Sequence, residues 1–149
     1  MLSNFMNSVK SKAADLKTSV LQYKNKSFLN AMASGAVLIA RADGNISAEE
    51  KQKMMAIISN NDTLSVFDQA DVIKVFNEYL GYFDFDADVG NSKAYEALNK
   101  IRGDVIQCRT LMRLTLAIAA SDGDFDEDER VIARKVAIEL GLTPAEFEL

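Results

Sequence analysis

Apolar residues recur every three to four positions along most of the chain, which predicts a protein built from amphipathic helices. The clearest such stretches are residues 28–42, 48–59, 69–82, 105–120 and 130–140. Sustained strand-like alternation is absent from them, and Pro144 is the only proline of the chain. We therefore predict an all-α fold, a single compact bundle of about seven helices.

Two of these helices are the most apolar and are expected to pack side by side. Residues 105–120 are hydrophobic on nearly every side, which is typical of a helix at the centre of a bundle. The helix over residues 28–42, which Ser27 can cap, needs its apolar surface covered in the same way. Each is followed by an acidic loop and a second helix. We predict two repeated units, approximately residues 28–59 and 105–141, within one domain of residues 27–149.

The two acidic loops match each other by residue class. Residues 43–50 read Asp-Gly-Asn-Ile-Ser-Ala-Glu-Glu, and residues 122–129 read Asp-Gly-Asp-Phe-Asp-Glu-Asp-Glu. Ser47 and Asp126 are predicted N-caps, each with a glutamate three residues later, Glu50 or Glu129, that completes a capping box. The glycine at the second position of each loop favours the left-handed turn that ends the preceding helix.

Capping does not explain the oxygen-bearing side chains that precede the caps. Alternate side chains of a tight loop can converge on one point, and several carboxylates are the ligands that hard divalent cations such as Ca²⁺ or Mg²⁺ prefer. The candidate metal ligands are therefore Asp43, Asn45, Glu50, Asp122, Asp124, Asp126 and Glu129. The two loops either face one another and form one site or lie a helix length apart and form two.

The acidic loops do not match a standard calcium-binding hand. Counting from Asp122, Glu127 stands where the hand requires glycine and Ala133 where it requires glutamate. A third acidic stretch, residues 83–88, alternates apolar and acidic residues and fits a strand, a turn or a chelating loop, with a solvated loop as the default. Asp88 or Ser92 is then expected to cap the next helix.

The loops and their flanking helices resemble the TerB family of tellurite-resistance proteins. The resemblance rests on two Asp-Gly-x-[Ile/Phe]-x-x-[Glu/Asp]-Glu motifs, each between an alanine-rich apolar helix and an amphipathic one, and it extends roughly from Ser27 to the C-terminus. It implies an all-helical fold, a divalent-metal site on the acidic residues, and a role in tellurite resistance and stress or phage defence with other Ter proteins at the inner membrane. Asp43, Glu50, Asp122 and Glu129 match the most typical positions, and Asn45 departs from the acidic pattern.

Composition narrows the class of function. A net charge of −5 and a pI near 4.8 argue against nucleic acid as the partner. The chain has no histidine, which excludes histidine-based catalysis, and its single Cys108 fits a buried structural thiol in a reducing, cytoplasmic compartment. We expect a binding module rather than an enzyme. The alternatives are a calcium sensor with a methionine-rich groove, from Met32, Met54, Met55 and Met112, and a metal-dependent hydrolase, which would lack a phosphate cradle.

Residues 1–26 differ from the rest of the chain. They contain five lysines and one aspartate, and their apolar side chains form one helical stripe: Leu2, Phe5, Val9, Ala13, Leu16 and Val20. The segment lacks the apolar core of a signal peptide, and no stretch of the chain is long enough to span a membrane. It is expected either to fold back on the acidic body or to lie on anionic lipid as a peripheral contact with the inner membrane.

Overall fold

The computed structural model describes residues 13–121, 123 and 125–149. This described part contains seven α-helices, two short 3₁₀ helices and no strand, which confirms the predicted all-α bundle. In chain order the elements are α2 (Ala13–Gln22), α3 (Lys26–Ala40), α4 (Ala48–Asn60), η1 (Thr63–Val66), α5 (Gln69–Phe85), α6 (Ala87–Ile101), α7 (Val105–Ala119), α8 (Glu127–Glu139) and η2 (Pro144–Phe147). That the chain is built from two repeated units remains a prediction.

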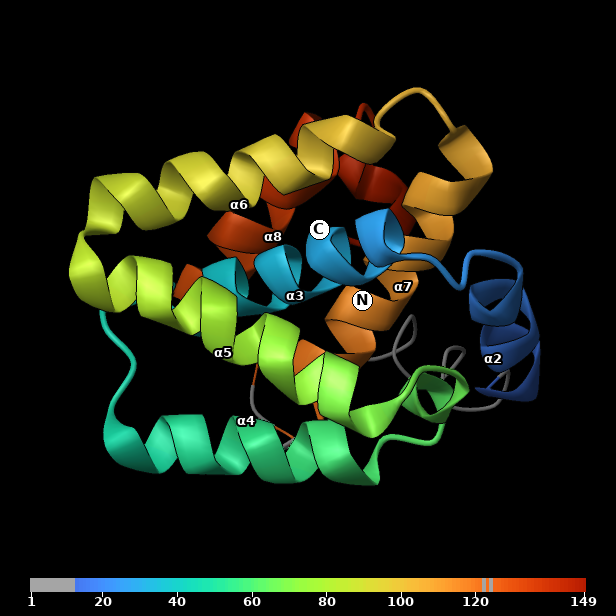
Figure 1. Cartoon of the computed structure of the whole chain (residues 1–149). Helices are drawn as coiled ribbons and strands as arrows, with labels where there is room; N and C mark the ends of the chain where they lie inside the picture. The colour runs from blue at the N-terminus through green and yellow to red at the C-terminus, as the bar shows by residue number, and fades with distance from the viewer. Residues whose placement is uncertain (1–12, 122, 124) are drawn as a thin grey trace.

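Helix α3 lies in the middle of the bundle and contacts α5, α6, α7 and α8 (Figure 1). All residues from Ala31 to Ile39 are buried, because small and apolar side chains occupy every side of this helix. The sequence placed residues 105–120 at the centre, but α7 keeps Arg113 exposed and packs beside α3. Gly35 permits this close packing, since a Cβ atom added there would lie 3.1 Å from Thr115 Cγ2.

The N-terminus of α3 lies two residues earlier than expected from a Ser27 cap. Asn25 is the N-cap: its backbone is extended, and its side chain accepts a hydrogen bond from the Phe28 amide at 2.9 Å. The prediction of Ser27 as the cap was therefore wrong, because both residue types can cap and the local pattern does not separate them.

Residues 83–88 form neither a strand, a chelating loop nor the solvated loop expected by default, because only Asp86 lies outside a helix. Helix α5 continues to Phe85, and Asp86 adopts an extended backbone that ends α5 and caps α6. The Asp86 carboxylate accepts hydrogen bonds from the amides of Asp88, at 2.8 Å, and Val89, at 3.2 Å, so neither Asp88 nor Ser92 is the cap. Asp86 is therefore the single residue that separates the two helices of the α5–α6 hairpin.

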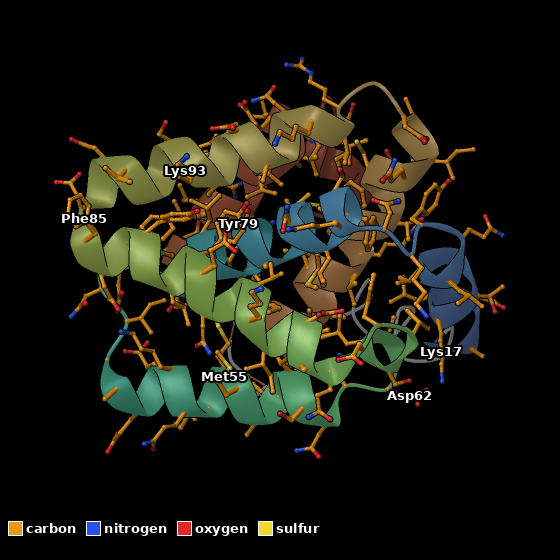
Figure 2. All side chains as sticks on the ribbon, viewed as in Figure 1. Lys17, Met55, Asp62, Tyr79, Phe85 and Lys93 are labelled. Carbon is orange, nitrogen blue, oxygen red and sulfur yellow. The ribbon has the colours of Figure 1, made fainter. Side chains whose placement is uncertain are left out.

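Helices α2 and α4 lie at the edge of the bundle (Figure 1). Helix α2 packs on η1 and α7 and buries Leu16 and Val20, and the Lys17 ammonium lies 3.2 Å from the Asp62 carboxylate (Figure 2). This part of the N-terminal stripe therefore folds back on the body, whereas residues 1–12 lie outside the described part of the chain. Helix α4 packs mainly on α5, and Lys51 forms an ion pair of 2.9 Å with Asp84.

Contacts made by the described C-terminal residues hold η2 against the bundle. Phe147 is fully buried, Arg109 Nε lies 2.6 Å from Glu146 Oε1, and the Arg130 guanidinium donates to the Glu148 carbonyl at 3.0 Å. Pro144 lies in the first turn of η2, and Thr143 before it makes no capping hydrogen bond through its side chain. None of the described helices combines the length and the hydrophobicity needed to cross a bilayer.

Candidate metal centre

Both acidic loops begin with a glycine turn that ends the preceding helix. The Gly44 amide donates to the Arg41 carbonyl at 2.7 Å, and the Gly123 amide donates to the Ala120 carbonyl at 3.0 Å. The φ angles of Gly44 and Gly123 are 98° and 81°, a region that strains any residue with a Cβ atom. The predicted role of these glycines is confirmed.

Both loops end in the predicted capping boxes. The Glu50 amide donates to Ser47 Oγ at 3.1 Å while the Ser47 amide donates to Glu50 Oε1 at 3.1 Å. In the second loop the Glu129 amide donates to Asp126 Oδ1 at 2.8 Å and the Asp126 amide donates to Glu129 Oε1 at 3.3 Å. An ionised carboxylate has about four acceptor positions. A capping hydrogen bond therefore does not by itself prevent these side chains from binding a cation.

The two loops face one cavity of about 270 Å³, which we call the acidic cavity. Asp43 and Glu50 line it from the first loop, and Asp126 and Glu129 line it from the second. Its apolar lining comes from α3 and the residues after it, from α4 and from the end of α7: Ala36, Ala40, Ala42, Met54, Ile57, Ile118 and Ala119. Of the two arrangements left open by the sequence, the structure has the loops on a common cavity.

Not every candidate ligand lies at the acidic cavity. Asn45 lines a separate cavity of about 160 Å³, together with Arg41, Lys51 and Asp84. Asp122 and Asp124 lie outside the described residues. Among the residues that the structure describes, no three acidic, cysteine or histidine side chains are grouped closely enough to hold a metal ion. The four described carboxylates therefore surround the acidic cavity without meeting at a single coordination point.

Comparison with known proteins identifies the family. The family model described as "Tellurite resistance protein TerB" matches residues 29–149. The chain belongs to the TerB family. A curated relative, "Tellurium resistance protein TerB" from Alcaligenes sp, is 39% identical over 79 residues, which cover 53% of this chain and 65% of the relative. The chain thus matches less than two thirds of that relative's length, and no solved structure matches it significantly.

The TerB match includes both acidic loops. It also includes one cationic residue of the acidic cavity that was not predicted from the sequence. Lys53 also lines the acidic cavity and is the one cationic side chain among its described lining residues. A signal was present in the sequence, because Lys53 follows Glu50 by three positions and residues so spaced share a helix face. An ammonium group beside four carboxylates lowers the net negative charge of the cavity and competes with any bound cation.

The single thiol of this TerB domain is structural, as predicted. Cys108 is fully buried on α7, and its Sγ donates a hydrogen bond to the Ile101 carbonyl at 3.3 Å. Burial raises the pKa of the Cys108 thiol, and the negative charge of Asp104 raises it further. The nucleophilic thiolate form is therefore disfavoured at neutral pH.

The third acidic stretch contributes nothing to the acidic cavity. Asp84 is bound to Lys51, with Lys51 Nζ at 3.0 and 2.9 Å from its two carboxylate oxygens, and Asp86 is the cap of α6. Asp84 and Asp86 therefore have structural roles, and not the chelating role that was one interpretation of the alternating Phe and Asp residues.

Proposed function

We propose that this TerB-family protein binds a divalent cation of the Ca²⁺ or Mg²⁺ class at the acidic cavity. The observation that carries the proposal is that both acidic loops line one cavity, although they are far apart in the sequence. Asp43, Glu50, Asp126 and Glu129 supply oxygen atoms only, which hard cations prefer over sulfur and nitrogen. Asp122 and Asp124 of the second loop complete the proposed ligand set, and Asn45, which lines the separate cavity, is left out of it.

Electrostatics favours cation binding at this place. Carboxylates that line one cavity repel one another. A divalent cation between the loops would convert that repulsion into attraction. Because the four carboxylates lie on two separate helix–loop–helix segments, the bound cation would also hold α4 and α8 together.

Titration with CaCl₂ or MgCl₂ tests the proposal directly. We expect the largest amide shifts in the NMR spectrum at residues 122–129, where the negative charge is densest, and smaller shifts at residues 43–50. At a cation concentration 100 times Kd, the stabilisation should reach about 2.7 kcal/mol and should be reversed by EDTA. An unchanged spectrum and melting temperature at millimolar cation would leave both loops as helix caps alone.

Neutral variants locate the site. Asp43→Asn keeps the shape of the side chain and the acceptor for the Asn45 amide, which lies 3.2 Å from Asp43 Oδ1, but it removes a charge. We expect it to weaken cation affinity, and Asp122→Asn to weaken it more, since the second loop has more carboxylates. The matched control is Asp88→Asn, an exposed aspartate that does not line the acidic cavity. Equal affinities in all three variants, measured by calorimetry, would contradict the assignment.

At the level of the cell, we propose a non-enzymatic role in tellurite resistance with other Ter proteins at the inner membrane. The TerB family match supports the first part, and the absence of histidine from the sequence and the buried state of Cys108 support a binding function. A pull-down from cells, done with and without chelator, tests the partner. We expect capture of Ter proteins that depends on the cation and is reduced in Asp43→Asn and Asp122→Asn.

Helix α4 supports a second candidate, a sensor that changes shape on cation binding. It carries Glu50 of the acidic cavity, packs mainly on α5, and exposes part of Met55 on its α5-facing side (Figure 2). Met32 and Met112 are fully buried in the core and would not line a surface groove. Binding of an apolar dye that rises with added Ca²⁺ would favour the sensor, whereas a constant signal would favour a static cation-binding module.

A peripheral contact with anionic lipid through residues 1–26 is the remaining part of the proposal. The described half of this segment buries Leu16 and Val20 on the body, so its contribution to lipid binding would come from exposed charge. Lys24 and Lys26, at its end, are exposed. Each lysine near an anionic membrane surface contributes about 1 kcal/mol to binding.

A further inference from the structure

Arg41 holds the turn that presents Asp43 to the acidic cavity. It is the C-cap residue of α3, and its carbonyl accepts a hydrogen bond from the Gly44 amide at 2.7 Å. Its guanidinium donates to the Gly44 carbonyl at 3.0 Å, so two hydrogen bonds between the same two residues enclose Asp43. The Asp43 carboxylate in turn accepts a hydrogen bond from the Asn45 amide at 3.2 Å. The turn around Asp43 is therefore fixed without a ligand.

The core of the bundle fixes the Arg41 side chain in its turn. The guanidinium lies over the Phe83 ring, 4.4 Å from the ring centroid, and a cation over an aromatic face is attracted to it. Phe83 is buried, and Gly90 of α6 packs closely against its ring. Arg41 therefore connects the first acidic loop to α5 and α6 through a ring that has little freedom to move.

Neutralising a carboxylate is not what Arg41 does in this structure. It does not line the acidic cavity and lies instead at the separate cavity of about 160 Å³. Asp84, the one acidic residue described there, is paired with Lys51, and Arg41 forms no ion pair within the described part of the chain. The contacts of its guanidinium are the hydrogen bond to the loop and the contact with the ring.

The second acidic loop cannot make the same contact. Ala120 stands two residues before the second Asp-Gly motif, where Arg41 stands before the first. An alanine side chain has no hydrogen-bond donor. The guanidinium contact therefore acts on the first loop alone, and its effects should be confined to that loop.

We propose that Arg41 is a positioning residue of the cation site and strengthens cation binding at the acidic cavity by holding Asp43 in place. The inference rests on the proposed function. Charge alone predicts the opposite result, because a positive group near the site repels the cation. Positioning favours binding, because a cation does not have to order a turn that is already formed. The two effects have opposite signs, so a measurement of affinity separates them.

The experiment compares two variants of the full chain that each lose one positive charge. Calorimetry is done with CaCl₂ or MgCl₂, whichever the parent chain binds more tightly, at a temperature where circular dichroism shows every variant folded. We expect Arg41→Gln to bind the cation about tenfold more weakly than the parent. Lys53 lines the acidic cavity, so Lys53→Gln removes a competing ammonium group and should bind at least about threefold more tightly.

The conservative variant Arg41→Lys separates charge from geometry. It keeps the positive charge, and its ammonium group can donate to the Gly44 carbonyl, but it cannot lie flat on the Phe83 ring as a guanidinium does. We expect it to recover part of the affinity that Arg41→Gln loses. In NMR spectra recorded without cation, Arg41→Gln should shift the Asp43 and Gly44 amides and leave the Gly123 amide in place.

Three outcomes would overturn the inference. An affinity of Arg41→Gln equal to or higher than that of the parent would show that charge outweighs positioning, and the cation site would stand without this role for Arg41. No recovery of affinity in Arg41→Lys would attribute the loss to altered packing alone. If the parent chain takes up neither Ca²⁺ nor Mg²⁺, the proposed cation site is wrong, and the role of Arg41 is excluded together with it.

Discussion

Replacing Phe28 with alanine is expected to lower the free energy of unfolding by about 3–5 kcal/mol. The Phe28 side chain is fully buried, and its ring lies between those of Tyr23 and Phe67. Alanine would leave a void there, because the flanking rings belong to separate segments, the α2–α3 turn and the residue after η1, that cannot both move inward. Urea unfolding followed by circular dichroism measures the loss.

The chain supplies a matched control for this substitution. Phe85, at the end of α5, is 82% exposed and points away from the bundle (Figure 2). Phe85→Ala should change the free energy of unfolding by no more than about 0.5 kcal/mol. If both variants lost the same stability, the aromatic stack would not be the element that fixes the α2–α3 turn.

The parts of the structure that were predicted correctly from sequence are those decided within a few residues. Ser47 with Glu50, and Asp126 with Glu129, form capping boxes because both partners lie within one helical turn. The glycine turns are equally local. Asn25 shows the limit of such reasoning, since the true cap of α3 and the expected one, Ser27, are two residues apart and both belong to residue types that favour the N-cap position.

Features that depend on distant residues were missed or left open. Residues 83–88 alternate in hydrophobicity because Phe83 is buried while Asp84 pairs with Lys51, which is 33 positions away in the sequence. Likewise, the meeting of the two acidic loops depends on how α3 and α7 pack at Gly35 and Thr115. The periodicity of the sequence carries no information about which helices pack together. One shared cavity and two separate sites were therefore equally consistent with the sequence.

Replacing Gly90 with alanine is expected to destabilise the protein by about 1–3 kcal/mol, although alanine normally favours a helix. A Cβ atom on Gly90 of α6 would lie well inside van der Waals contact of the Phe83 ring. That ring is buried and cannot swing aside without displacing its neighbours. Gly81→Ala is the control: it lies within α5 with no atom near its added Cβ, so the same substitution should stabilise by about 0.5–1 kcal/mol.

The Gly90→Ala substitution should also change the conformation of the first acidic loop. The Arg41 guanidinium lies over the Phe83 ring, 4.4 Å from its centroid, and donates a hydrogen bond to the Gly44 carbonyl at 3.0 Å. A displaced ring would therefore move Arg41 and with it the turn that presents Asp43 to the acidic cavity. In NMR spectra of Gly90→Ala we expect the Gly44 amide to shift and the Gly123 amide, in the second loop, to stay in place. Equal shifts at both glycines would mean that stability is lost globally and not through Phe83 and Arg41, and the first loop would then owe its shape to its own capping box alone.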